Sequence, residues 1–235
     1  MKIVDGHAFL GTTIYLNQDL DSLISYMDRL GMEVSVVVAP PPGPFYEDAN
    51  RIVQEAVRKY PERLVALYRA NPHLEGEAER VENALQEQGF VGAQMDPTND
   101  GYGVGNSVVE PIIKAAEEHS APVYVHSGDS IFCPPEDIAD LAAKFEAVDF
   151  VMPMSRRAPR AARDRSNLYL MTRPFPTLAF QRGYAENFDL ERVIFATDSP
   201  IGCPEIELRR VELADLDPEV KLKILGGTLR RIIPI

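Results

Sequence analysis

Two histidines and one aspartate stand at the ends of apolar, β-branched runs in the sequence. His7 ends the first such run, His126 ends the fifth, and Asp198 follows the eighth. Side chains at the carboxyl ends of barrel strands point toward the same open mouth, so these three could meet there although they lie far apart in the chain. Two imidazoles and a carboxylate are a sufficient ligand set for one catalytic divalent ion with open coordination positions.

The same three residues could also work without a metal. A carboxylate beside two imidazoles can take up or deliver a proton, so Asp198 would be a general base with His126 or His7 as its acid partner. In a third interpretation, Asp198 and His126 only hydrogen-bond each other in a barrel that no longer catalyses a reaction. The residues alone leave all three interpretations open.

Further polar residues at the predicted strand ends are candidates for binding a substrate. Arg69 ends the third run, Gln94 and Asp96 end the fourth, and Arg173 follows the seventh. A guanidinium group pairs with a carboxylate through two parallel hydrogen bonds. We therefore expect a small-molecule carboxylate as the substrate, with Arg173 as its main clamp.

Strand-length apolar runs alternate with segments of helical period along the chain, which is typical of parallel strands joined by helices. Eight such units predict a single-domain α/β fold, a (β/α)8 TIM barrel over residues 1–235, although an open doubly wound sheet shows the same alternation. The predicted strands are Lys2–His7, Glu33–Ala39, Leu64–Ala70, Phe90–Asp96, Pro122–His126, Asp149–Pro153, Asn167–Thr172 and Arg192–Thr197. The predicted helices are Asp19–Leu30, Glu47–Lys59, Glu75–Gln88, Ser107–His119, Pro135–Phe145 and Thr177–Asn187.

The composition limits the classes of partner. The 235 residues are 45% hydrophobic and carry a net charge of −12, which would repel both a nucleic-acid backbone and an anionic membrane surface. No stretch is apolar enough to span a membrane, and the first residues do not resemble a secretory signal, so we expect a cytoplasmic protein that binds neither nucleic acid nor membrane. Neither a phosphate-binding GxGxxG loop nor a GxSxG nucleophile turn occurs, which disfavours nucleotide binding and serine-based acyl transfer.

Four segments carry a resemblance to a known family. They read IVDGHAFLG, APVYVHSG, RVIFATDSP and LKILGGTLRRI, and the first three contain His7, His126 and Asp198. Their order and spacing resemble the amidohydrolase-related family of metal-dependent TIM-barrel hydrolases and decarboxylases, in particular the branch that contains aminocarboxymuconate-semialdehyde decarboxylase. The resemblance implies an often dimeric barrel that holds one zinc-like ion between a strand-one His-x-His, a strand-five histidine and a strand-eight aspartate. It also implies a strand-six histidine as the acid or base.

The sequence departs from this family pattern at three positions. Phe9 stands where the second histidine of the strand-one pair is expected, and Met154 stands where the acid–base histidine is expected. Gln94 stands where some members carry a lysine that is carboxylated to bridge two metals, so a two-metal centre is not expected. The remaining ligands would hold one ion weakly, zinc before manganese or iron, or no ion at all. Phe9 and Met154 would make the mouth apolar, which suits an aromatic or polyketide-like substrate.

These observations predict an enzyme that hydrolyses or decarboxylates a small cyclic or unsaturated organic acid, and the resemblance adds a homodimer. Two alternatives follow from the departures at Phe9 and Met154. One is a metal-independent lactonase, isomerase or cyclase that transfers protons through the aspartate and histidines of the same cleft. The other is a non-catalytic barrel that binds a small molecule or acts as a scaffold.

Overall fold

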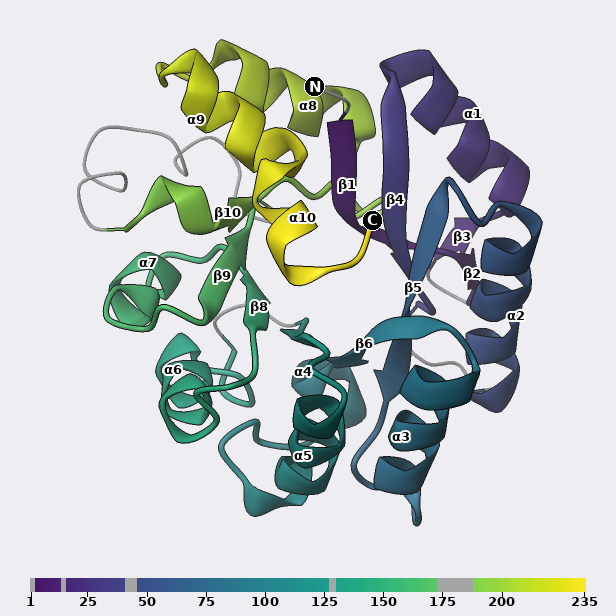
Figure 1. The fold of residues 1–235 in the computed structure, drawn as a ribbon, viewed down its shortest axis with the longest axis vertical. Coiled ribbons are helices and arrows are strands. Elements are labelled where there is room, and N and C mark those ends of the chain that lie inside the picture. Colours follow the sequence, from purple (N-terminus) through teal and green to yellow (C-terminus); the bar gives the residue numbers. More distant parts are fainter. Residues whose placement is uncertain (1–2, 14–15, 41–45, 127–129, 173–187) are drawn as a thin grey trace.

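Buried, mostly aliphatic runs form eight strands that pair side by side in the order of the sequence (Figure 1). The computed structural model describes residues 3–13, 16–40, 46–126, 130–172 and 188–235. The eight strands are β1 (Ile3–Phe9), β4 (Met32–Val38), β5 (Leu64–Ala70), β6 (Phe90–Met95), β7 (Val123–Val125), β8 (Phe150–Pro153), β9 (Leu168–Met171) and β10 (Val193–Ile194). All eight predicted strands are present, and each neighbouring pair is parallel.

The chain beyond β10 returns to β1 and closes the sheet into a barrel. The Gly6 N–H donates to the carbonyl oxygen of Phe195 at 2.8 Å, and the Asp198 N–H donates to that of His7 at 2.9 Å. A doubly wound sheet reverses its strand order around the first strand, whereas the order here is sequential. The fold is therefore the predicted single-domain (β/α)8 barrel, and the open-sheet alternative is excluded.

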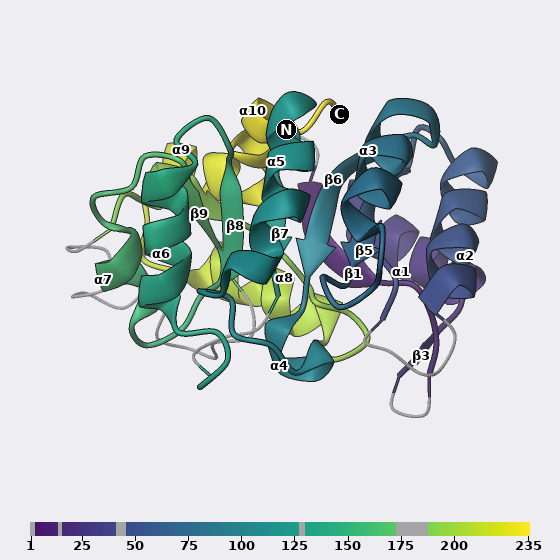
Figure 2. The same cartoon turned by 90° about the horizontal axis from the view of Figure 1, so that it is seen from below.

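Helices surround the barrel on its outside (Figures 1 and 2). Five predicted helices are confirmed as α1 (Leu20–Leu30), α2 (Tyr46–Lys59), α3 (Glu77–Glu87), α5 (Glu110–Glu118) and α6 (Pro135–Lys144). Local signals set the ends of α1: the Asp19 carboxylate accepts from the Ser22 N–H at 2.7 Å, and Gly31 ends the helix at a φ of 67°. The predicted helix Thr177–Asn187 lies outside the described residues.

Elements that the periodicity did not predict complete the fold. They are the hairpin β2 (Gly11–Thr12) and β3 (Asn17–Gln18), the helices α4 (Pro97–Asp100), α7 (Ala158–Ala162), α8 (Pro204–Leu213), α9 (Pro218–Leu222) and α10 (Leu229–Ile232), the 3-10 turns Ser107–Val109 and Leu190–Arg192, and the π-helical turn Lys223–Gly227. Most are too short to show a helical period. Within the described ranges, no helix combines the length and the apolar character needed to cross a membrane.

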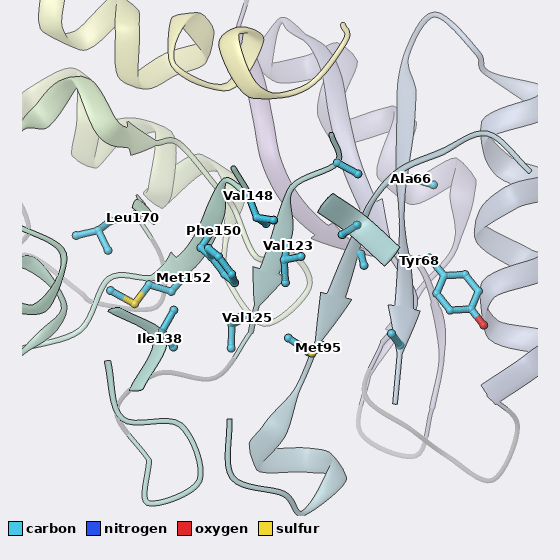
Figure 3. Packing of buried hydrophobic residues seen from close by; sticks show 14 of the residues in the cluster. Ala66, Tyr68, Met95, Val123, Val125, Ile138, Val148, Phe150, Met152 and Leu170 are labelled. Carbon is cyan, nitrogen blue, oxygen red and sulfur yellow. The ribbon is translucent and has the colours of Figure 1, made fainter. Parts of the chain in front are cut away.

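Alternating side chains of the strands build two hydrophobic clusters. The outer cluster lies between the strands and the helices, and Figure 3 shows part of it, where Met152 of β8 lies near Ile138 of α6. The inner cluster lies inside the barrel and includes Val36, Leu67 and Tyr124. Because strand side chains point alternately to the two faces, each strand contributes to both clusters and the barrel interior is filled.

A β-bulge in β1 sets the direction of the side chains at the barrel mouth. Asp5 pairs with Ser35 and Ala8 pairs with Val37, so β1 advances three residues where β4 advances two. The extra residue changes the phase of the inward and outward alternation. As a result His7 faces the inside of the barrel, while Asp5 faces the helix side.

Gly6 allows β1 to approach the end of β10 closely. A Cβ atom at this position would lie 2.4 Å from Cγ2 of Ile194 and 2.8 Å from the carbonyl oxygen of Phe195. We expect Gly6→Ala to lower the free energy of unfolding by about 1–3 kcal/mol, because an extra methyl group in a packed interior forces the neighbours apart. Urea denaturation monitored by circular dichroism measures this loss.

Gly103→Ala is the matched control for this substitution. The three atoms nearest to a Cβ atom at Gly103 would all belong to the side chain of Asn106, the closest at 3.2 Å. The control should change the free energy of unfolding by less than about 0.5 kcal/mol, as is usual for surface substitutions. Equal losses in both variants would show that the contact of Gly6 with β10 is not tight.

Candidate functional site

The three predicted metal ligands meet at the carboxyl-terminal mouth of the barrel. His7 belongs to β1, His126 follows β7 directly, and Asp198 lies in the segment after β10. Asp198 has a φ of 53°, in the left-handed region, where aspartate is among the residues best tolerated. Its N–H bond to the His7 carbonyl fixes this turn against β1.

One carboxylate oxygen of Asp198 faces both imidazoles. Oδ1 lies 2.9 Å from Nδ1 of His7 and 3.0 Å from Nε2 of His126. The two imidazole rings stack nearly parallel, with centroids 4.7 Å apart and planes inclined by 9°. The His7 side chain is fully buried, and that of His126 is 13% exposed, so the group is reached from the His126 side.

Burial and charge set the protonation of the three groups. Burial lowers the pKa of His7 and favours the neutral imidazole. Burial also opposes the charges on His126 and Asp198, but their mutual attraction, with Asp96 contributing at His126, outweighs it: the pKa of His126 is raised to about 10 and that of Asp198 is held well below its usual range. Asp198 is thus an ionised carboxylate beside a neutral His7.

Each imidazole has an acceptor near its other nitrogen. Oε1 of Gln94 lies 2.8 Å from Nε2 of His7, within hydrogen-bond distance, and Oδ2 of Asp96 lies 3.6 Å from Nδ1 of His126. Histidines that bind metals generally direct their second nitrogen at a carboxylate or carbonyl oxygen, which fixes the ring and its tautomer. The surroundings of both rings follow this pattern.

The donor set fits a single divalent ion. The candidate ligand atoms of His7, His126 and Asp198 all lie within 4.8 Å of one another. Two ligands bound at right angles, each ~2.1 Å from an ion, are ~3.0 Å apart, which matches the separations of Asp198 Oδ1 from the two nitrogens. In addition, the buried Nδ1 of His7 makes no hydrogen bond with the described residues, despite its short distance to the carboxylate.

Arg69 and Asp96 extend the site into a buried charge network. The guanidinium of Arg69 lies 3.4 Å from Oδ2 of Asp96 and 3.0 Å from Oδ1 of Asp100, and all three side chains are inaccessible to solvent. Asp96 also caps α4 and accepts from the Asn99 side chain at 2.7 Å. The network therefore holds Asp96 beside His126. A direct contact of Arg69 or Asp96 with a substrate stays a prediction.

The other predicted substrate-binding residues differ in their placement. Phe9 lies inside the barrel with its ring edge-on to both imidazoles, at centroid distances of 4.9 Å from His7 and 5.1 Å from His126. Met154 is buried in the outer cluster, so its side chain belongs to the layer under the helices and not to the inner cluster that contains Phe9. Arg173 lies outside the described residues.

Asp5 is a buried carboxylate without a cationic partner among the contacts that the structure gives it. Its Oδ1 accepts from the backbone N–H groups of Thr197 at 2.8 Å and His7 at 3.3 Å. Its Oδ2 accepts from three hydroxyl groups, those of Thr197 at 2.6 Å, Tyr26 at 3.3 Å and Ser35 at 3.4 Å. Burial raises the pKa of Asp5 to about 6. The carboxylate thus ties β1 to α1, to β4 and to the segment that carries Asp198.

Sequence reasoning missed the roles of Asp5 and Asp100. Both are acidic residues close in sequence to a predicted site residue: Asp5 precedes His7 by two positions, and Asp100 follows Asp96 by four. An acidic residue inside an otherwise apolar strand is itself a signal, because a buried carboxylate requires several donors. Its partners could not be named, since they come from distant parts of the chain.

Comparison with known families identifies this barrel. Residues 14–235 match the family model described as Amidohydrolase. The chain belongs to the amidohydrolase family. No curated protein matches the sequence of this amidohydrolase.

Solved structures with the same fold include two decarboxylases and a hydratase. The 5-carboxyvanillate decarboxylase of Sphingomonas paucimobilis has a TM-score of 0.80 at 14% identity, over 100% of this chain and 99% of that one. A dihydroxybenzoic acid decarboxylase of Polaromonas sp. JS666, with bound manganese and the inhibitor 2-nitroresorcinol, has a TM-score of 0.72 at 15% identity over 98% and 96%. The 4-oxalomesaconate hydratase of Rhodopseudomonas palustris has a TM-score of 0.72 at 16% identity over 99% and 95%. The likeness covers the whole barrel and establishes its fold.

The hydrogen bonds of Asp5 predict an unusual tolerance for asparagine. An amide oxygen can replace Oδ1 for the two backbone donors, and two of the three hydroxyl groups can turn to accept from the two hydrogens of the amide nitrogen. We expect Asp5→Asn to lower the free energy of unfolding by less than about 1 kcal/mol, and Asp5→Ala to lower it by about 3 kcal/mol because buried N–H groups lose their acceptor. Urea denaturation of both variants tests this. An asparagine variant as unstable as the alanine variant would contradict the assigned hydrogen-bond pattern.

Proposed function

We propose that this protein is a metal-dependent decarboxylase of a small cyclic or unsaturated carboxylic acid. The observation that carries the proposal is the convergence of His7, His126 and Asp198 on one point at the barrel mouth. Family membership and the decarboxylases that share the whole fold support the same class of reaction. A carboxylate substrate is supported by the two decarboxylases with the same fold, which are named for aromatic acids, and by the hydratase, which is named for 4-oxalomesaconate.

His7, His126 and Asp198 would hold the ion. When bound, a divalent ion supplies a positive charge that orients oxygen atoms of the substrate and stabilises negative charge that develops on it. Manganese is bound in the Polaromonas decarboxylase and in a 5-carboxyvanillate decarboxylase of Novosphingobium aromaticivorans that shares the fold, so manganese takes the place of zinc as the ion to test first. The states of His7 and Asp198, a neutral imidazole and an ionised carboxylate, are those required of ligands, whereas His126, whose pKa is raised to about 10, would release its proton when the ion binds.

The residues around the imidazoles suit a planar, partly apolar substrate. Phe9 presents an aromatic ring next to both histidines and excludes water from that side. Gln94 is fully buried behind His7, and its side-chain nitrogen makes no hydrogen bond with the described residues. A flat acid bound against Phe9 would therefore meet an apolar surface on one side and polar groups at its edge.

Decarboxylation requires a proton for the carbon atom that loses carbon dioxide. A thioether carries no acidic proton, and Met154 occupies the position where the family resemblance implies the acid–base histidine. We therefore propose that another group, or a water molecule held at the mouth, delivers this proton. This difference also predicts a substrate whose ring is itself easily protonated, such as a hydroxylated aromatic acid.

The proposal is tested by metal binding and by release of carbon dioxide from a panel of hydroxylated benzoic acids that includes 5-carboxyvanillate and 2,6-dihydroxybenzoate. Asp198→Asn and His126→Ala should each lower the affinity for Mn²⁺ by at least ~100-fold, since even the loss of a group behind a ligand costs 10–100-fold. The rate of carbon dioxide release should fall together with the affinity for Mn²⁺. Electron paramagnetic resonance measures free Mn²⁺, and a coupled assay measures carbon dioxide.

His119→Gln is the control for the histidine substitution. His119 follows α5, on the side of the barrel where β7 begins and thus opposite the mouth. This variant should bind Mn²⁺ and release carbon dioxide like the unchanged protein. An unchanged protein that binds no Mn²⁺, or an Asp198→Asn variant that keeps full activity, would refute the proposal.

A further inference from the structure

Gln94 is a buried amide whose side-chain oxygen lies within hydrogen-bond distance of His7. It lies on β6, level with Arg69 of β5 and Tyr124 of β7, and its side chain is inaccessible to solvent. Its Oε1 lies 2.8 Å from Nε2 of His7. Gln94 thus occupies the side of His7 that faces away from Asp198, whose carboxylate lies 2.9 Å from Nδ1.

The hydrogen-bond acceptor near Nε2 of His7 decides whether Nδ1 carries a hydrogen or a lone pair. A neutral imidazole has one N–H and one lone pair. When Nε2 donates its hydrogen to Oε1 of Gln94, Nδ1 carries the lone pair and faces the Asp198 carboxylate, which is also only an acceptor. A histidine that binds a metal ion through one nitrogen keeps its single N–H on the other nitrogen.

Two acceptor atoms 2.9 Å apart repel each other unless a positive charge lies between them. The arrangement of Nδ1 and the carboxylate is therefore poor for a hydrogen bond and good for coordinating a cation. The geometry agrees, because Nδ1 of His7 makes no hydrogen bond with the part of the chain that the structure describes, despite its distance to Asp198.

We propose that Gln94 is a positioning residue that keeps the proton of His7 on Nε2 and thereby makes Nδ1 a metal ligand. The inference rests on the proposed metal centre and specifies which atom of His7 serves it. It also gives a reason for an amide at this position, since an amide oxygen can accept from His7 without adding a charge to the barrel interior.

The competing arrangement has the Gln94 amide turned around. Its nitrogen would then donate to Nε2, and the His7 proton would sit on Nδ1 and point to Asp198. That arrangement joins His7 and Asp198 by an ordinary hydrogen bond and leaves no lone pair on His7 for an ion. The two arrangements differ in the position of one proton, which can be observed directly.

Nitrogen-15 NMR of the histidine rings locates this proton. The chain has only four histidines. The double variant His73→Gln/His119→Gln therefore shows only the ring signals of His7 and His126. Adding His126→Ala removes the signals of His126 and so identifies those of His7. In the protein saturated with Zn²⁺, a diamagnetic probe, we expect a protonated Nε2 and an unprotonated Nδ1 in His7. A protonated Nδ1, or a protein that binds no Zn²⁺, would overturn the inference.

Two substitutions distinguish an effect of Gln94 on the His7 proton from an effect of its packing alone. Gln94→Met keeps the length of the side chain but has no strong acceptor, and it should weaken Mn²⁺ binding by about 10–100-fold, the usual cost of losing a group behind a ligand. Gln94→Glu keeps an acceptor oxygen and should bind Mn²⁺ at least as tightly as the unchanged protein. Equal affinities in the methionine variant and the unchanged protein would overturn the proposal.

The outcomes of these measurements distinguish a failure of the proposed role of Gln94 from a failure of the decarboxylase proposal. If Zn²⁺ binds with the proton on Nε2 but no acid in the panel loses carbon dioxide, the role of Gln94 stands and the decarboxylase proposal falls. If an acid is decarboxylated with Mn²⁺ while His7 carries its proton on Nδ1, the decarboxylase proposal stands and the role of Gln94 falls.

Discussion

The contact between β1 and the segment after β10 is the constraint on which the rest of the structure depends. It closes the barrel, and it brings Asp198 to His7 in the same step, because the Asp198 N–H binds the His7 carbonyl. Gly6 permits the close approach, and the bulge turns His7 inward and Asp5 outward. Closure of the barrel and assembly of the site are therefore one event.

Buried carboxylates at this end of the barrel are stabilised in three different ways. Asp5 accepts hydrogen bonds from neutral donors and acts as a structural tie. Asp96 is balanced by the Arg69 guanidinium and by the start of α4. Asp198 faces the imidazoles of His7 and His126 through its Oδ1, and it is the carboxylate of the proposed metal centre. The three buried carboxylates thus differ in the type of partner more than in the depth of burial.

Much of the fold could be predicted from the sequence, because hydrophobic period and strand length are local properties. The same period placed His7, His126 and Asp198 at strand ends, and the barrel then required them to meet. The direction of a side chain is less local: Met154 joined the outer cluster, and the outward turn of Asp5 depends on a bulge that appears only when β1 pairs with β4. The partners of Arg69 lie on another strand end and a four-residue helix, too short for a periodic signal.

The order of the ligands along the chain has a consequence for protein synthesis. His7 and His126 leave the ribosome before Asp198, and the turn that holds Asp198 is hydrogen-bonded to β1 through the His7 carbonyl. A growing chain therefore cannot bring the three residues together until nearly all of its strands exist, and domains fold as units once their sequence is available. Under the proposed metal centre, an ion would meet all three of its ligands only in a finished barrel.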